Sequence, residues 1–165
     1  MEELTPPDTF ARLRRVLAAH RRHVLDTLQG LSDEQVQQAM LPSGWTMAGM
    51  VRHLALDVER FWFRASLAGE EVELFSGRQV WEADGLGTAE VIALYTAECA
   101  AADAALDRTD AGTSLAWWPE ELFGPAFYHD ALALVVHVIG ETATHAGHLD
   151  AARELLDGKQ HLVLQ

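Results

Sequence analysis

The 165 residues carry 25 Asp and Glu against 12 Lys and Arg, which gives a formal net charge of −13 at pH 7 and a pI of about 4.8. With Lys159 as the sole lysine and no basic cluster, the chain is a poor candidate for binding nucleic acid or an anionic membrane surface. The length suits one domain over residues 1–165 with its own hydrophobic core.

The apolar runs and the N-terminus indicate a soluble cytoplasmic protein. No apolar run reaches the ~20 residues that a membrane span requires. The start, Met-Glu-Glu-Leu-Thr-Pro-Pro, lacks the basic and apolar regions of a signal peptide. A single cysteine, Cys99, leaves no internal disulfide framework, and its alanine-rich surroundings favour a small core residue over a nucleophile.

Helical periodicity dominates the chain, and strand signals are weak. After Pro6 and Pro7, a first long helix is predicted from Asp8 or Thr9 to about Leu28, because apolar residues recur at steps of three and four. Its inward stripe is Phe10, Leu13, Leu17, Val24 and Leu28, with His20 filling a slot between them.

A short helix and a second long helix are predicted next. Ser32 and Gln35 have the spacing of a capping box, which indicates a short helix ending near Met40. Thr46 is a suitable N-cap for the second long helix, and His53 lies beside the buried stripe of that helix. This stripe consists of Met47, Met50, Leu54, Val58 and Phe61.

Two long connections separate the remaining long helices. Residues 69–87 are expected to be irregular, and Thr88 is a candidate N-cap for a third helix that ends near Leu106. The next connection contains Trp117 and Trp118, for which anchoring the loop is favoured over lining a pocket mouth. The fourth helix runs from about Asp130 to Leu156, with Gly158 as its stop.

Four long helices predict an all-α four-helix bundle. Connections in such bundles usually have two to eight residues, and those after the second and third helices are longer. Either two neighbouring helices are not antiparallel, or the connections roof a pocket, or both.

A polar stripe on the fourth helix is the strongest functional signal. His137, Glu141, His145 and His148 follow at steps of four, four and three, and burying such groups is costly unless they are paired or bind a metal. The i,i+4 pair of Glu141 and His145 points two ligand atoms the same way, and a ligand from a facing helix would complete an open three-point site. A solvent-facing stripe, or histidines with ordinary hydrogen bonds, is the alternative, and the pair alone does not decide between them.

Three segments resemble a known family: Leu41–Gly44, Val51–Trp62 and Val136–Asp150 with its tail to Gly158. The last of them is the specific one. The chain is similar to the DinB-like metalloprotein superfamily, which includes YfiT-like proteins and the N-terminal domains of mycothiol-dependent maleylpyruvate isomerases.

The resemblance implies a DinB-type four-helix bundle with a divalent metal. One ligand would come from the second helix and an i,i+4 pair from the fourth, and the matching residues are His53, Glu141 and His145. Glutamate at the middle position resembles the isomerase branch. We expect Zn²⁺, with Ni²⁺, Mn²⁺ or Fe²⁺ as alternatives, and one or two positions open to water or substrate.

Further polar residues lie one turn from these expected ligands. His148 is the catalytic candidate, as a proton shuttle, and it is also an alternative ligand; His137 could likewise orient a ligand or act as an acid or base. Asp57 could hold the His53 imidazole, and Asp150 is expected to pair with Arg153.

Three functions are compatible with this site. The first is a metal-dependent S-transferase or isomerase that uses mycothiol, bacillithiol or another small thiol, whose thiolate the metal would stabilise. The full isomerases have a second domain that this chain lacks after its fourth helix, which argues against that particular isomerisation. The second is a metal-dependent hydrolase, and the third is a non-enzymatic metal-binding stress-response protein. The acidic, helical chain also permits a homodimer.

Overall fold

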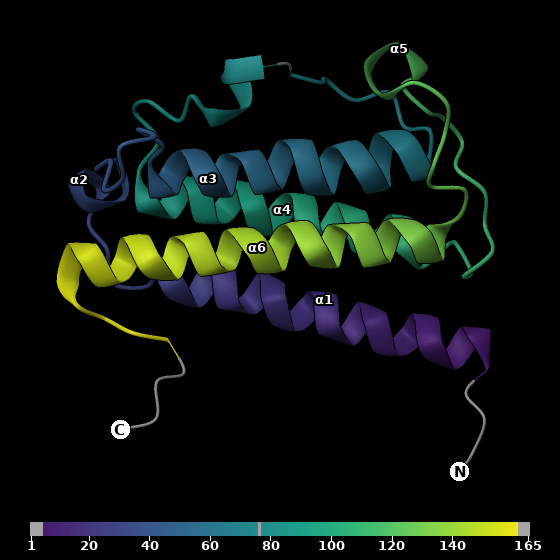
Figure 1. The fold of residues 1–165 in the computed structure, drawn as a ribbon, viewed down its shortest axis with the longest axis horizontal. Helices are drawn as coiled ribbons and strands as arrows, with labels where there is room; N and C mark the ends of the chain where they lie inside the picture. Colours follow the sequence, from purple (N-terminus) through teal and green to yellow (C-terminus); the bar gives the residue numbers. More distant parts are fainter. Residues whose placement is uncertain (1–4, 76, 162–165) are drawn as a thin grey trace.

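The structure of the chain is a computed structural model that describes residues 5–75 and 77–161. The regular secondary structure of this part is helical without a strand, so the all-α prediction is confirmed. Ser114 and Asp130 form an isolated β-bridge. In chain order the helices are α1 (Pro6–Leu28), α2 (Asp33–Val36), α3 (Met47–His53), η1 (Leu54–Leu67), η2 (Gly77–Trp81), α4 (Thr88–Leu106), α5 (Glu120–Phe123) and α6 (Ala131–Asp157) (Figure 1).

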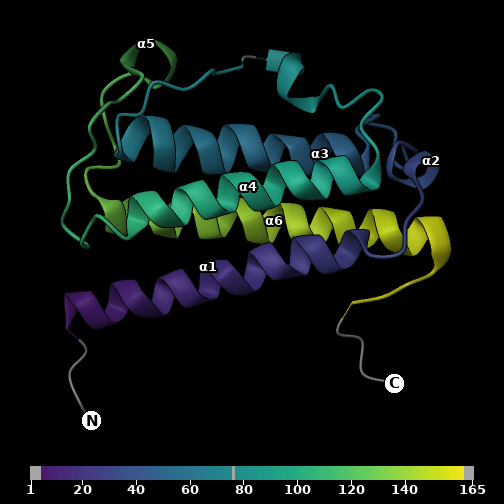
Figure 2. The same cartoon turned by 180° about the vertical axis from the view of Figure 1, so that it is seen from behind.

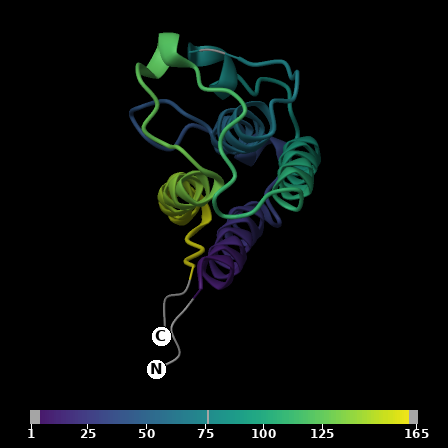
Figure 3. The ribbon, with the colours of Figure 1, turned by 90° about the vertical axis from the view of Figure 1, so that its right-hand side faces the viewer.

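Four long helical segments, α1, α3 with η1, α4 and α6, lie side by side (Figure 1 and Figure 3). α1 packs on α6, η1 packs on both α4 and α6, and α1 also contacts α4. α1 and α6 run in one direction, whereas α3–η1 and α4 run in the other, as the same cartoon seen from behind confirms (Figure 2). The neighbours η1 and α4 are therefore parallel, and the chain between them must travel back along their whole length.

The connection between α4 and α6 has a different reason for its length. α4 ends and α6 begins at the same end of the molecule, so a short loop could join them (Figure 1). The connection instead rises to α5 and returns, and it lies with the η2 connection over the outer face of α3–η1 (Figure 3). Both expectations for the long connections therefore hold, since two neighbouring helices are parallel and both connections cover one face.

Local chemistry explains most helix ends. α1 begins two residues before the predicted start, because Pro6 occupies a first-turn position where no N–H is needed and Thr5 caps the helix. The capping box of Ser32 and Gln35 is present, although α2 ends at Val36 and not near Met40. Gly158 ends α6 with a positive φ of 78°, which a glycine adopts without strain.

The inward face of α1 contains a charged residue where an uncharged one was expected. The slot between Leu17 and Val24 is filled by Arg21, which is only 5% exposed, and the prediction of His20 for this slot is wrong. Both nitrogens of one edge of the Arg21 guanidinium bind the carboxylate of Glu59 on η1, at 2.7 and 2.6 Å. Glu59 is completely buried, so the pair forms a charged contact inside the core.

Other residues behave as expected. Burial, with the negative charge of Glu59 adding to it, raises the pKa of the Cys99 thiol, which fits a packing role better than a nucleophilic one. The backbone N–H of Trp117 donates to the Ser66 carbonyl, and the Trp118 indole N–H donates to the Gly124 carbonyl at 2.7 Å. The Trp117 ring also lies against Phe61 and the Trp118 ring against Trp62, so the two tryptophans anchor the α4–α6 connection on η1. No described helix combines the length and the apolar character needed to cross a membrane.

Candidate metal centre

The predicted polar stripe lies on α6. Asp130 caps this helix by accepting a hydrogen bond from the Ala133 N–H, and the helix continues unbroken to Asp157. Glu141 and His145 consequently share one face, with 3.5 Å between Glu141 Oε2 and His145 Nε2. Two groups able to bind a metal therefore project from adjacent turns of one helix.

His53 reaches the same place from the end of α3. Because α3–η1 and α6 run in opposite directions, His53 faces His145 and Trp62 faces His137. The imidazoles of His53 and His145 are nearly perpendicular, at 87°, with 5.0 Å between their ring centroids. One potential ligand atom from each of His53, Glu141 and His145 lies within 4.8 Å of the other two.

The His53 ring is held on two sides. Asp57 Oδ2 lies 3.2 Å from His53 Nδ1, which leaves the opposite nitrogen, Nε2, free to bind a metal. The Trp81 indole stacks on the imidazole at 4.1 Å between centroids and 10° between planes. η2 can bring Trp81 this close because α3 has a glycine at position 49, where an added Cβ would lie 2.5 Å from the Trp81 carbonyl oxygen.

The electrostatics suit a metal ligand. Burial, and then the neighbouring His53, lower the pKa of His145 to about 4, while Glu141 opposes this shift only in part. The His145 imidazole is therefore neutral at pH 7, which is the form that binds metals. Two imidazoles and one carboxylate from facing helices are an ordinary donor set for a catalytic divalent ion, and they leave coordination positions for water or substrate.

The two other histidines of the stripe lie on different sides of this cluster. His148 is exposed, and its Nδ1 lies 3.5 Å from Nδ1 of His145, at the outer limit of a hydrogen bond. His137 is half-buried, and its Nδ1 lies 2.8 Å from the hydroxyl of Tyr128. Burial lowers the pKa of His137 although Glu141 opposes the shift. His148 therefore contacts the candidate ligand His145, whereas His137 belongs to a hydrogen-bonded pair with Tyr128.

A second cluster among the described residues consists of His23, Asp150 and His161. His23 Nε2 lies 2.9 Å from Asp150 Oδ1, but the His23 and His161 rings stack at 3.6 Å and 16°. The lone pairs of stacked imidazoles lie in nearly parallel planes and do not converge on one ion, so this cluster is the weaker candidate. The predicted pair of Asp150 with Arg153 is wrong, because Arg153 binds Asp157, one helical turn further on.

An aromatic cleft of about 460 Å³ opens beside the candidate centre. The candidate ligands His53 and Glu141 line it, together with His137 and Asp57. Its apolar walls come from η1 and from both long connections, so the covering segments seen in Figure 3 do border a pocket. The apolar residues are Val58, Phe61, Trp62, Phe75, Leu122 and Phe123.

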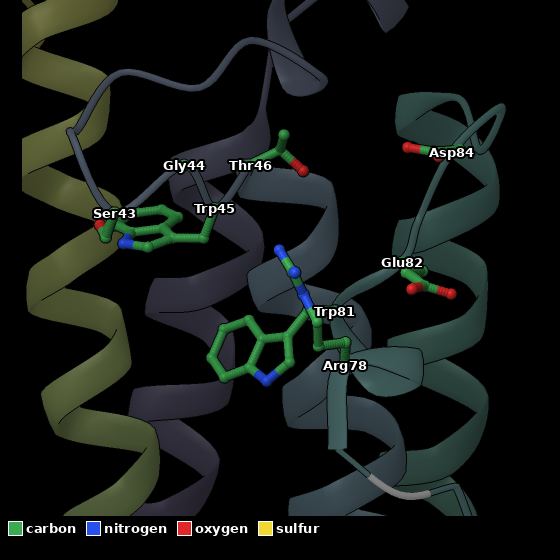
Figure 4. A pocket seen from close by; sticks show the side chains of 8 residues that line it. All are labelled: Ser43, Gly44, Trp45, Thr46, Arg78, Trp81, Glu82 and Asp84. Atoms are coloured by element: carbon green, nitrogen blue, oxygen red, sulfur yellow. The ribbon is translucent and has the colours of Figure 1, made fainter.

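A polar groove of about 510 Å³ is lined by the Trp81 indole (Figure 4). Its walls are the segment before α3, with Trp45, and the segment around η2, with Arg78 and two carboxylates, Glu82 and Asp84. None of the three candidate ligands lines this groove. Trp81 lines the groove and stacks on His53, and His53 lines the cleft.

Comparison with known protein families identifies one match. A family described as mycothiol S-transferase matches residues 12–158 of the chain. The chain belongs to this family. Mycothiol S-transferases are DinB-like proteins, so the resemblance seen in the sequence is confirmed. No curated protein and no solved structure matches the chain.

In this member of the mycothiol S-transferase family, the sequence predicted that His53, Glu141 and His145 lie together, as they do. It also offered Asp57 as a residue that could hold His53, and the two side chains are in contact. It missed Trp81, which stacks on His53, and the contact of Tyr128 with His137. Trp81 and Tyr128 lie outside the long helices, so no helical period links them to the site. The close approach of the Trp81 carbonyl oxygen to Gly49 could not be predicted, because it depends on where η2 lies.

Proposed function

We propose that this protein is a metal-dependent S-transferase that joins mycothiol, or a related small thiol, to an electrophilic carbon. The observation that carries the proposal is the convergence of His53, Glu141 and His145 within 4.8 Å, in a chain that belongs to the mycothiol S-transferase family. We also infer that the four long segments are the bundle of the DinB type, with zinc as the ion. An isomerase reaction is not part of the proposal.

The residues of the centre have separate tasks. His53 and His145 present imidazole nitrogens and Glu141 a carboxylate, while Asp57 and Trp81 fix the plane of the His53 ring. A divalent ion held there would supply positive charge that lowers the pKa of a thiol, so that the thiolate is present at neutral pH. Transfer then forms a sulfur–carbon bond, the leaving group departs with its electron pair, and the thiol proton is released.

His148 is proposed as a positioning residue for His145. Its Nδ1 faces Nδ1 of His145, on the exposed side of that ring, and it does not line the aromatic cleft. A hydrogen bond between the two Nδ1 atoms orients the His145 imidazole so that Nε2 faces Glu141. The proton-shuttle role expected of His148 stays a prediction.

The test is thiol alkylation by iodoacetamide, which is small enough to need no particular pocket. Zinc-loaded protein should accelerate the loss of free thiol from mycothiol, and chelation or His145→Ala should remove the acceleration. Thr144→Ala, an exposed neighbour on α6, should keep full activity. No acceleration with mycothiol, bacillithiol or cysteine under any metal loading would overturn the S-transferase proposal, and hydrolysis without thiol would favour the hydrolase alternative.

A further inference from the structure

The walls of the aromatic cleft are unusual for a surface in contact with water. Phe123 stacks on Trp62 at 5.7 Å and 24°, and it meets Phe61 edge to face at 6.1 Å. Phe123 nevertheless stays 45% exposed, and its neighbour Leu122 is 70% exposed. An apolar molecule of flat shape would cover these side chains and remove their apolar surface from water.

The charges around the cleft restrict what can enter. Its lining contains two carboxylic acids, Asp57 and Glu141, and no lysine or arginine. The whole chain carries a net charge of −13, so an anionic molecule would approach against the field of the protein. In metal-free protein an anion inside the cleft would have no cationic side chain among the lining residues to replace its hydration, whereas a bound divalent ion would itself attract an anion.

The position of the cleft places its occupant beside the reaction centre. His53 and Glu141 line the cleft, whereas none of the three candidate ligands lines the polar groove at Trp81. The groove has Arg78, Glu82 and Asp84, which can hydrogen-bond the hydroxyl groups of a polar thiol carrier. The polar groove thus suits a polar thiol, and the aromatic cleft suits an apolar second substrate.

We propose that the aromatic cleft binds the electrophilic second substrate and selects flat, neutral, apolar electrophiles against anionic ones. This inference rests on the proposed S-transfer, and it adds the substrate class. For an aryl halide, the thiol sulfur bonds to the ring carbon and halide leaves with the electron pair of the broken bond, while the thiol proton goes to solvent. Phe123 and Trp62 hold the ring of the electrophile, and His53 and Glu141 lie where its reactive carbon must arrive.

The first test is binding to metal-free protein without any thiol. 1,3-Dinitrobenzene is a neutral, flat ring without a leaving group, and it should quench the tryptophan fluorescence of the protein saturably after correction for its absorbance. Phe123→Ala should weaken this binding about ten-fold, the order expected for a lost aromatic contact. Leu122→Ser should weaken it as well, and the anion 3,5-dinitrobenzoate should bind at least about ten-fold less tightly.

The control is Val136→Ala, because Val136 is 52% exposed on α6 and does not line the cleft. This variant should bind 1,3-dinitrobenzene like the parent protein. Unchanged binding in both Phe123→Ala and Leu122→Ser, or equal binding of the neutral ring and the anion, would overturn the proposed selectivity. These binding measurements use no thiol, so a negative result would not contradict an S-transfer activity measured with iodoacetamide.

Steady-state kinetics give the second test. With 1-chloro-2,4-dinitrobenzene as electrophile, Phe123→Ala should raise the KM for the electrophile about ten-fold and leave the KM for mycothiol unchanged. An equal rise in both values would place Phe123 in the thiol site and contradict the assignment. Normal iodoacetamide activity of the same variant would show that the S-transfer itself is intact.

Discussion

At the scale of single residues, the candidate centre depends on a His145 imidazole that the fold keeps neutral. Burial and the nearby His53 lower the pKa of His145 to about 4, from about 6.5 for a free histidine. At a pH between these two values, His145 is neutral in the folded chain and protonated in the unfolded chain. Because the His145 imidazole lacks its second proton, one ring nitrogen can bind a metal, and the fold becomes sensitive to acid.

This linkage predicts the pH dependence of stability in metal-free protein. The folded pKa of His145 lies below the unfolded value, so its contribution to stability is complete above about pH 6.5 and falls as the pH decreases toward 4. His145→Gln removes this contribution. Urea unfolding between pH 7 and pH 4 should give a shallower loss of stability in the variant than in the parent chain. Identical pH profiles would mean that His145 is not held neutral by the fold.

The side chains of the centre also mark how far the sequence alone could lead. His53, Glu141 and His145 could be brought together because helical spacing and the resemblance to the DinB-like superfamily place them on facing helices. Trp81 could not, because a short helix inside an irregular connection carries it. The roles of His137 and His148 could not be separated either, since both lie one turn from an expected ligand and only packing distinguishes their surroundings.

At the scale of helices, a buried ion pair joins α1 to the segment that carries His53. Periodicity predicted which face of α1 is inward, but it could not predict that Arg21 on this face would meet a fully buried Glu59 on η1. A charged residue in an apolar stripe looks like an interruption until its partner is known. Asp103 on α4 accepts a further hydrogen bond from the same guanidinium at 2.7 Å, so the three segments are tied together.

Glu59→Gln should destabilise the fold strongly. The substitution leaves the buried Arg21 charge with Asp103, which is half exposed, as its remaining carboxylate partner. Removing one partner of a buried pair costs about 3–5 kcal/mol, which urea unfolding would measure. Asp107→Asn is the control, because the Arg14–Asp107 pair is largely exposed at the carboxylate and should change stability by less than about 0.5 kcal/mol. A loss of under about 1 kcal/mol in Glu59→Gln would contradict a structural role for the pair.

At the scale of the whole molecule, the order of the helices explains where the site can lie. Because η1 and α4 are parallel, the chain between them crosses the full length of the molecule, and η2 on this crossing delivers Trp81 to His53. The connection from α4 to α6 brings α5 to the same face (Figure 3). The length of the two connections in the sequence indicated that they could cover a pocket. Their paths could not be predicted, because they depend on side chains that follow no regular period. A homodimer stays a prediction.

The net charge of −13 also acts on the whole molecule. It favours the approach of a divalent cation and opposes that of anionic substrates. Charge alone does not make a site, however, because exposed carboxylates attract cations weakly and without fixed stoichiometry. A bound ion must therefore be traced to particular ligands.

The metal content of the purified protein tests the central claim most directly. Protein prepared without a histidine tag, loaded with Zn²⁺ and passed through a desalting column, should retain about one ion per chain by elemental analysis. His53→Ala and His145→Ala should retain none while keeping the circular dichroism of the helices, and Thr144→Ala should retain as much as the parent chain. Full retention of the ion in both histidine variants would contradict the centre formed by His53, Glu141 and His145.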